Sequence, residues 1–283
     1  MAARPATLVD KLSLIPHVTI GLSVGLARLA TRPFTNDVKP PTAFKDFVYA
    51  VFRHVLARVT IPLEKWLTIP TEETYLTWAA KKNIEADTAV LASGVKVHWI
   101  GNPSSEKVFL YFHGGGYVNP ITPEHLDWLL ELQTDLSKTK SVAVAVLGYT
   151  CAPEGQYPLQ LRQGAESLLW LLSAQGKKPE DVSHCFPCKT IATCWLICSA
   201  QIFIGGDSAG ANLALGLLSH ILHPHPKFED ELRIKLPNPL AGAILTSPWI
   251  KFPTDDDSTT RNAGSDFVCK EAADRWGAAF HGM

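Results

Sequence analysis

The sequence predicts an α/β protein with a mostly parallel sheet and helices on both faces of that sheet. From about residue 85, short apolar runs alternate with longer segments of helical periodicity, the pattern of consecutive strand–helix units. The run Lys107–Phe112 (KVFLYF) is apolar almost throughout, as expected of a strand covered on both faces. We therefore divide the chain into an N-terminal helical cap segment, 1–84, and an α/β core, 85–283.

The elements of the core follow one another in a regular order. The predicted strands are Val95–Ile100, Lys107–Phe112, Val142–Leu147, Ile202–Ile204 and Ala241–Leu245. The predicted helices are Pro123–Leu136, Gln163–Leu172 and Ala211–Leu222. Only the first strand alternates apolar and polar residues, and this period of two favours a position at the edge of the sheet.

Two further helices are expected before the core. Leu12–Ala27 is mildly apolar, but Pro16 interrupts it early, which argues against the continuous apolar segment of a signal peptide. A cap or docking helix is the first interpretation, and an interfacial membrane anchor and a signal anchor are the alternatives. Thr42–Thr60 carries an apolar stripe at helical spacing, which would pack on the protein or on lipid.

Composition excludes several classes of protein. The 283 residues are 46% hydrophobic and carry a net charge of −1, which is too apolar and too weakly charged for a disordered chain. A sequence pI of about 6.8 argues against a nucleic-acid partner. No uninterrupted apolar run reaches the roughly 18 residues of a spanning helix. We expect a cytoplasmic protein or one peripheral to an intracellular membrane, and we leave its oligomeric state open.

A serine nucleophile is indicated by Gly206–Gly210 (GDSAG), which fits the G-x-S-x-G nucleophile elbow. The elbow places its serine on a strained turn from a strand into a helix, so its neighbours must be small. An apolar run precedes the motif and a helix-forming run, ANLALGLL, follows it. Because this context matches the one the elbow requires, Ser208 is the candidate nucleophile.

A loop of backbone donors is indicated by His113-Gly114-Gly115-Gly116, directly after KVFLYF. Acyl transfer develops negative charge on the carbonyl oxygen, and fixed N–H groups must stabilise it. Glycines let the backbone turn its amides toward that oxygen. A phosphate-binding loop is disfavoured, because no Gly-Lys-Ser/Thr tail follows.

Four motifs in order, HGGGY, YTCAPE, GDSAG and SPW, resemble the hormone-sensitive-lipase group of α/β-hydrolases, which includes arylacetamide-deacetylase-like and steryl-acetyl-hydrolase-like esterases. The resemblance implies an α/β-hydrolase fold and an oxyanion hole. The amides that it assigns to the oxyanion hole belong to Gly115, Gly116 and Ala209. The motif residues that it assigns to supporting roles are His113, Gly114 and Asp207. Thr150 and Cys151 depart from the YRLAPE of the group, with loop packing as the expected consequence.

The same resemblance implies a carboxylester hydrolase with a small-molecule ester substrate and with no metal or organic cofactor. The ester would be small or lipophilic, and a secondary metabolite, a sterol or a xenobiotic would each fit. The catalytically impaired remnant or ligand-binding pseudoenzyme of the same family is the alternative. A third hypothesis is a membrane-associated lipid-binding module that uses the N-terminal helices.

The acid and the histidine of a catalytic triad are not identified. In this fold they follow the serine on loops after further strands, yet residues 251–283 contain no apolar run of four or more. His281 is the one histidine in this tail, and it lies in a helical segment rather than after a strand. We expect the last two strands to be missing, and we leave the acid and the base unassigned.

The segment Val182–Gln201 interrupts the family pattern and holds four of the six cysteines, Cys185, Cys188, Cys194 and Cys198. A zinc loop and a disulfide-bearing loop are two interpretations, although the cysteine pairs stand closer than in a zinc ribbon. We favour a translated intron, because Val-Ser can be encoded by the splice donor GTGAGT and Gln by the acceptor CAG. Sequencing the transcript distinguishes a retained intron from a real loop.

Overall fold

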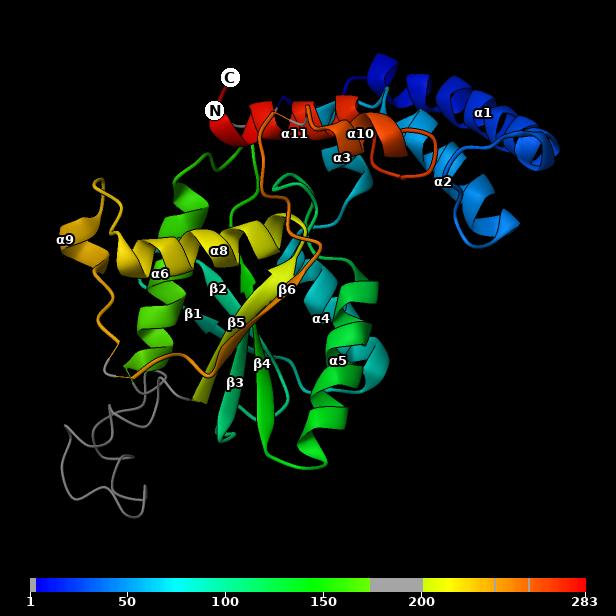
Figure 1. Ribbon diagram of the computed structural model, residues 1–283. Helices are drawn as coiled ribbons and strands as arrows, with labels where there is room; N and C mark the ends of the chain where they lie inside the picture. Colours follow the sequence, from blue (N-terminus) through cyan, green and yellow to red (C-terminus); the bar gives the residue numbers. More distant parts are fainter. Residues whose placement is uncertain (1–3, 174–200, 237, 254) are drawn as a thin grey trace, which may run out of the picture. The chain divides into compact units, whose positions relative to one another are not determined.

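The computed structural model describes residues 4–173, 201–236, 238–253 and 255–283 (Figure 1). The predicted insert 182–201 lies outside the described residues except for Gln201. The described strands are β1 (Asp87–Val90), β2 (Lys96–Ile100), β3 (Lys107–Phe112), β4 (Val142–Gly148), β5 (Ile202–Asp207) and β6 (Gly242–Thr246). They form one sheet in the order β1-β2-β4-β3-β5-β6.

The sheet is parallel from β4 to β6, as the sequence predicts. β3 pairs in parallel with both β4 and β5, and β5 pairs in parallel with β6. In this register Phe112 lies opposite Gly206. The carboxyl ends of β3 and β5 therefore lie side by side, and each leads into one of the two glycine-containing motifs.

The predicted position of β2 at the sheet edge is wrong. β2 runs antiparallel to β4 on one side and to β1 on the other, so that β1 is the edge strand. The alternation that indicated an edge comes from His98, which is buried and stacked on the Tyr75 ring with 4.6 Å between ring centroids. A polar residue in this strand thus marks a buried ring contact.

Helices cover both faces of the sheet, as expected (Figure 1). On one face α4 (Thr71–Lys82) and α5 (Pro123–Ser137) pack on the sheet through a buried cluster that includes Trp78, Leu126 and Tyr111. On the other face lie α6 (Leu159–Leu172) and α8 (Ala209–Leu222). The short helix α9 (Glu229–Leu232) contacts α6.

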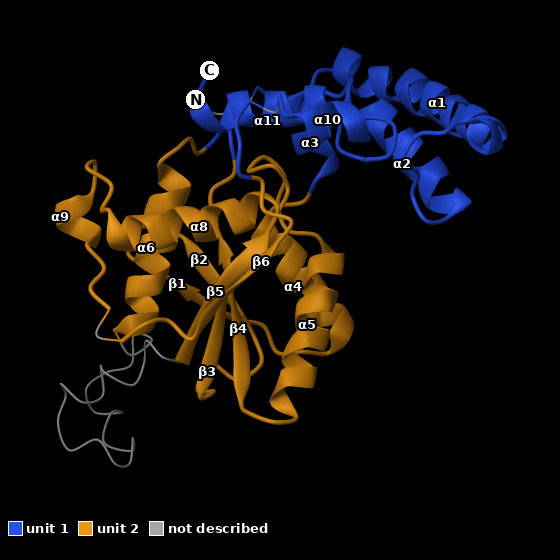
Figure 2. Ribbon diagram, viewed as in Figure 1, with its two compact units in different colours: residues 1–68, 152–154, 250–283 blue, residues 69–151, 155–249 orange. Residues whose placement is uncertain are grey.

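The described chain forms two compact units (Figure 2). Unit 2 spans 69–151 and 155–249 and contains the sheet. Unit 1 spans 1–68, 152–154 and 250–283. The helices of unit 1 are α1 (Leu8–Thr31), η1 (Arg32–Phe34), α2 (Ala43–Leu56), α3 (Ile61–Leu67), α10 (Asp257–Asn262) and α11 (Lys270–His281). The predicted boundary at residue 84 stays a prediction.

Helix α1 continues through Pro16, as the predicted cap or docking helix does, so this proline interrupts the apolar run but not the helix. A capping box at Thr7 and Asp10 begins the helix, and the missing N–H of one proline leaves only one carbonyl without its helical partner. By length and composition, Leu8–Phe34 is the one stretch in the described residues that could cross a membrane. α1 packs lengthwise on α2 through Gly21 and Gly25.

Candidate active site

Ser208, the expected nucleophile, lies on a strained turn between β5 and α8. Its backbone has φ 49° and ψ −115°, a region that costs a non-glycine residue about 1–3 kcal/mol. A Cβ atom on Gly206 or Gly210 would lie 2.2 or 1.9 Å from the Phe112 carbonyl oxygen. The two glycines therefore let the end of β3 pass against the elbow, and Ser208 stays partly exposed.

The backbone of Ser208 is held from the side of β6 as well. Its N–H donates to the Thr246 carbonyl at 2.9 Å. Its carbonyl accepts hydrogen bonds of 3.1 Å from the N–H groups of Asn212 and Trp249. The strained turn is thus fixed by its own helix and by the SPW motif that follows β6.

The triple-glycine loop leaves β3 in a conformation that favours glycine. Gly115 has φ 104° and Gly116 has φ 62°, and both values lie in the left-handed region. The Gly115 carbonyl accepts hydrogen bonds from Val118 and Asn119, at 3.1 and 2.8 Å, which close the turn. Among the described residues, no acceptor binds the N–H groups of Gly115, Gly116 or Ala209. These three amides remain available as donors.

Asp207 joins the loop to the elbow. Its Oδ1 accepts hydrogen bonds from the Gly114 N–H, at 2.7 Å, and from the Tyr111 hydroxyl. Burial raises the pKa of this carboxyl, but the hydrogen-bonding and electrostatic contact with His125, together with the hydrogen bonds from Tyr111 and Gly114, outweighs burial and leaves the pKa below its ordinary value. A Cβ atom on Gly114 would lie 2.1 Å from Oδ2, so the close approach requires glycine.

His125 holds the second oxygen of Asp207. The Thr122 N–H donates to His125 Nδ1 at 3.3 Å, as part of the cap of α5. Because Nδ1 accepts, the proton of the neutral ring lies on Nε2, which donates to Asp207 Oδ2 at 3.3 Å. The start of α5, the elbow and the glycine loop are thus connected through one carboxylate.

His113 braces the loop from inside the protein. It is fully buried and stacks on Tyr149 with 4.2 Å between ring centroids. Its Nδ1 donates to the Gly114 carbonyl at 2.7 Å, and the Tyr149 hydroxyl donates to the His113 carbonyl at 2.8 Å. This environment supports the expected structural role of His113.

The sequence did not reveal the side chains that organise Asp207. The sequence places Tyr111 only in a buried strand and His125 only in a predicted helix. No spacing in the sequence connects either residue to position 207, because the contacts depend on how β3 and α5 pack. The Thr122-Pro-Glu-His125 order indicates a helix start, but it does not indicate the second contact of the histidine.

His281 belongs to unit 1, whereas Ser208 belongs to unit 2. The His281 ring packs edge-on against Phe252, with 5.3 Å between ring centroids. The expectation that His281 is not the general base stays a prediction. Among the described residues, no cluster of three or more His, Cys, Asp or Glu side chains could hold a metal ion, and the cysteine-rich segment lies outside them.

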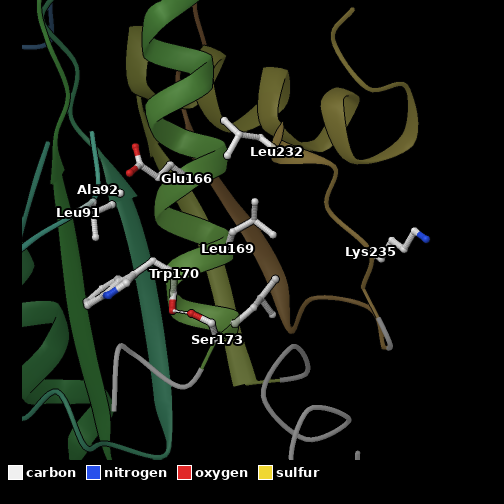
Figure 3. A pocket seen from close by; sticks show the side chains of 9 residues that line it. Leu91, Ala92, Glu166, Leu169, Trp170, Ser173, Leu232 and Lys235 are labelled. Atoms are coloured by element: carbon white, nitrogen blue, oxygen red, sulfur yellow. Dashed lines mark hydrogen bonds between the residues drawn. The ribbon is translucent and has the colours of Figure 1, made fainter. Parts of the chain in front are cut away.

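A pocket of about 380 Å³ lies elsewhere in unit 2 (Figure 3). Figure 3 shows Glu166, Leu169 and Trp170 of α6 on one of its walls and Leu91 on another. None of its lining residues belongs to the elbow or to the glycine loop. The pocket is therefore separate from the candidate active site.

The parallel sheet, the strained serine between β5 and α8 and the glycine loop after β3 together define the α/β-hydrolase class. A family described as the alpha/beta hydrolase fold matches residues 109–281, more than half of the chain, and the chain belongs to this family. The expected fold class and the resemblance to α/β-hydrolases are confirmed at this level.

Curated relatives are similar to the chain over part of their length. Probable carboxylesterase 13 of Arabidopsis thaliana is 31% identical over 81% of this chain and 57% of its own. Steryl acetyl hydrolase 1 of Saccharomyces cerevisiae is 27% identical over 52% of this chain and 28% of its own. The chain thus spans about half the length, or less, of the curated relatives that it matches.

A solved structure agrees with the fold. An esterase from the bacterial hormone-sensitive lipase family has a TM-score of 0.51 and 23% identity, with 100% of this chain and 70% of that chain covered. This likeness supports the arrangement of strands and helices.

Proposed function

We propose that this protein is a serine carboxylester hydrolase. The observation that carries the proposal is the elbow itself, where Ser208 lies on a strained turn that Asp207 connects to the loop of Gly115 and Gly116. The amides of these glycines and of Ala209 have no acceptor among the described residues. Donors of this kind stabilise the oxyanion of an acyl-transfer transition state by about 3–4 kcal/mol each.

The proposed reaction proceeds in two acyl transfers. Ser208 Oγ attacks the ester carbonyl carbon, and the carbonyl electron pair moves onto the oxygen that the amides stabilise. The bond to the alcohol oxygen breaks, and the alcohol leaves with the proton of Ser208 Oγ. Water then attacks the acyl-enzyme, releases the carboxylic acid and gives one of its own protons to Ser208 Oγ. The proposal assigns the nucleophile and the oxyanion donors, and it leaves the general base unassigned.

We propose as substrate a carboxylic ester of a short or medium acyl chain on a lipophilic alcohol. The names of the relatives, carboxylesterase and steryl acetyl hydrolase, support this class. A lipophilic ester partitions into membranes, so the proposed location is the cytoplasm or the surface of an intracellular membrane.

A fluorophosphonate probe and a short-chain p-nitrophenyl ester test the proposal together. We expect stoichiometric labelling and hydrolysis in the wild type, and loss of both in Ser208→Ala. Ser219→Ala, on the exposed side of α8, is the matched control and should behave as wild type. His281→Gln should also keep its labelling rate. Folded wild-type protein that neither labels nor hydrolyses, yet binds the ester, would support the pseudoenzyme instead.

A further inference from the structure

The outer side of α1 carries an apolar stripe. Its members follow one another at intervals of four and three residues, which places them on one face of a helix. They are Leu8, Leu12, Ile15, Thr19, Leu22 and Leu26. The five aliphatic side chains of this stripe are 45–71% exposed. In a globular protein such a stripe normally faces the core, so its exposure here requires a physical reason.

The side of α1 that packs on α2 is a different one. At Gly25 an added Cβ would lie 2.8 Å from the Phe47 ring, and at Gly21 it would touch Val51 and Val55 at 3.4–3.5 Å. Because both glycines lie outside the stripe on the helical wheel, α1 turns its smallest residues toward α2. The aliphatic side chains of the stripe lie on another side of the helix and are exposed.

Charge is absent along the whole outer surface of α1 for more than four turns. No Asp, Glu, Lys or Arg lies between Lys11 and Arg28. A protein partner would normally meet charged and polar side chains at the rim of such a surface. A helix that carries an apolar stripe and no charged side chain over such a length is typical of a protein core or a lipid environment, and α1 is largely exposed in the described chain.

The ends of this surface suit a lipid headgroup layer. Residues 4–46 contain six basic and three acidic side chains, which favours an anionic surface. Phe34 and Phe44, on either side of the connection from α1 to α2, are 86% and 74% exposed. Aromatic and basic residues beside an apolar helix are typical of interfacial membrane helices.

The contacts of α1 distinguish lying on a membrane from crossing it. Asp46 of α2 is fully buried and accepts hydrogen bonds from Arg28, at 2.9 Å, and from Arg32. A spanning α1 would have to break these ion pairs or carry them toward the hydrocarbon, which is costly. An α1 that lies in the plane of the interface keeps all of them.

We propose that the stripe on α1, defined by the six residues above, docks the protein in the plane of an anionic lipid surface. This inference extends the proposed location of the enzyme and does not depend on its activity. Failure of the esterase assay would therefore leave it intact.

The test is co-sedimentation of the full chain with vesicles of phosphatidylcholine, alone or mixed with phosphatidylserine. We expect the wild type to bind, more strongly to the anionic vesicles, and to be released by alkaline carbonate. The variant Leu12→Glu/Leu22→Glu should bind more than about tenfold more weakly, because each substitution replaces an inserted apolar group with a charge. Leu12→Ser/Leu22→Ser should lie between the two.

The matched control is Val90→Glu/Leu222→Glu, which adds the same charges at two exposed apolar positions of unit 2. It should bind as wild type. No vesicle binding by the wild type, or equal binding by the stripe variants, would overturn the proposal. Resistance to carbonate would indicate a spanning helix, and a dimer that forms without vesicles and dissociates in the stripe variants would indicate a second copy of this chain. Either result would also overturn it.

Discussion

Asp207 is the residue on which the geometry of the site depends most. It accepts hydrogen bonds from three directions, and these come from β3, from the glycine loop and from α5. All three donors require the same carboxylate orientation, immediately before the strained Ser208. A change in the orientation of this one side chain would consequently move the nucleophile and the oxyanion loop together.

The substitution Asp207→Asn tests this dependence. An amide in place of the carboxylate presents an N–H to at least one donor and weakens charge-assisted hydrogen bonds. We expect ester hydrolysis to fall about 10- to 100-fold and the free energy of unfolding to fall by about 1–3 kcal/mol. Asp135→Asn, at an exposed pair with Lys138, should change neither quantity. Wild-type hydrolysis and stability in Asp207→Asn would contradict the assigned role.

At the scale of elements, the long strands and helices of the core could be predicted from periodicity, because their burial produces continuous apolar runs. β1 could not, since its four residues, DTAV, carry no distinctive pattern. α1 could be predicted as a helix, although its observed bounds, Leu8–Thr31, extend beyond the predicted Leu12–Ala27 at both ends. In the site, sequence motifs predict Ser208 and the glycine loop. The contact of His125 with Asp207 depends on tertiary packing, which leaves no local signal in the sequence.

The packing contact between α1 and α2 gives a second prediction. Gly25→Val would place side-chain atoms against Phe47 and Val51. Even a Cβ atom added at this glycine would lie only 2.8 Å from the side chains of these two residues. Such overpacking typically costs about 1–3 kcal/mol, so hydrogen exchange in α1 should accelerate about 5- to 150-fold. Ala27→Val, on the exposed side of the same helix, should have a much smaller effect. Equal exchange rates in the two variants would mean that the contact with α2 does not stabilise α1.

At the scale of the whole molecule, His98 connects stability to pH. It lies buried in β2, between β1 and β4, and its Nδ1 is hydrogen-bonded to the Thr88 hydroxyl. Its Nε2 has no hydrogen-bond partner among the described residues. Burial lowers its pKa to about 4, while nearby Glu72 raises the pKa and Lys96 lowers it further. The unfolded chain has the ordinary value of about 6.5.

Between these two values the unfolded state binds more protons than the folded state, so stability rises with pH. The stability of the wild type should therefore fall by about 3 kcal/mol as the pH is lowered from about 6.5 to 4. In His98→Phe, which keeps a ring against Tyr75, this part of the loss should disappear. Urea unfolding across this range measures it, and the exposed His223→Gln is the control. An unchanged pH profile in His98→Phe would exclude His98 as the source.

The proposed activity requires Ser208 and the glycine loop to form one site, and a crystal structure of the fluorophosphonate adduct measures this most directly. We predict a phosphonyl group covalently bound to Ser208 Oγ, with its oxygen within about 3 Å of the N–H groups of Gly115, Gly116 and Ala209. An adduct whose oxygen points away from these amides, or a folded protein that forms no adduct at Ser208, would contradict the account.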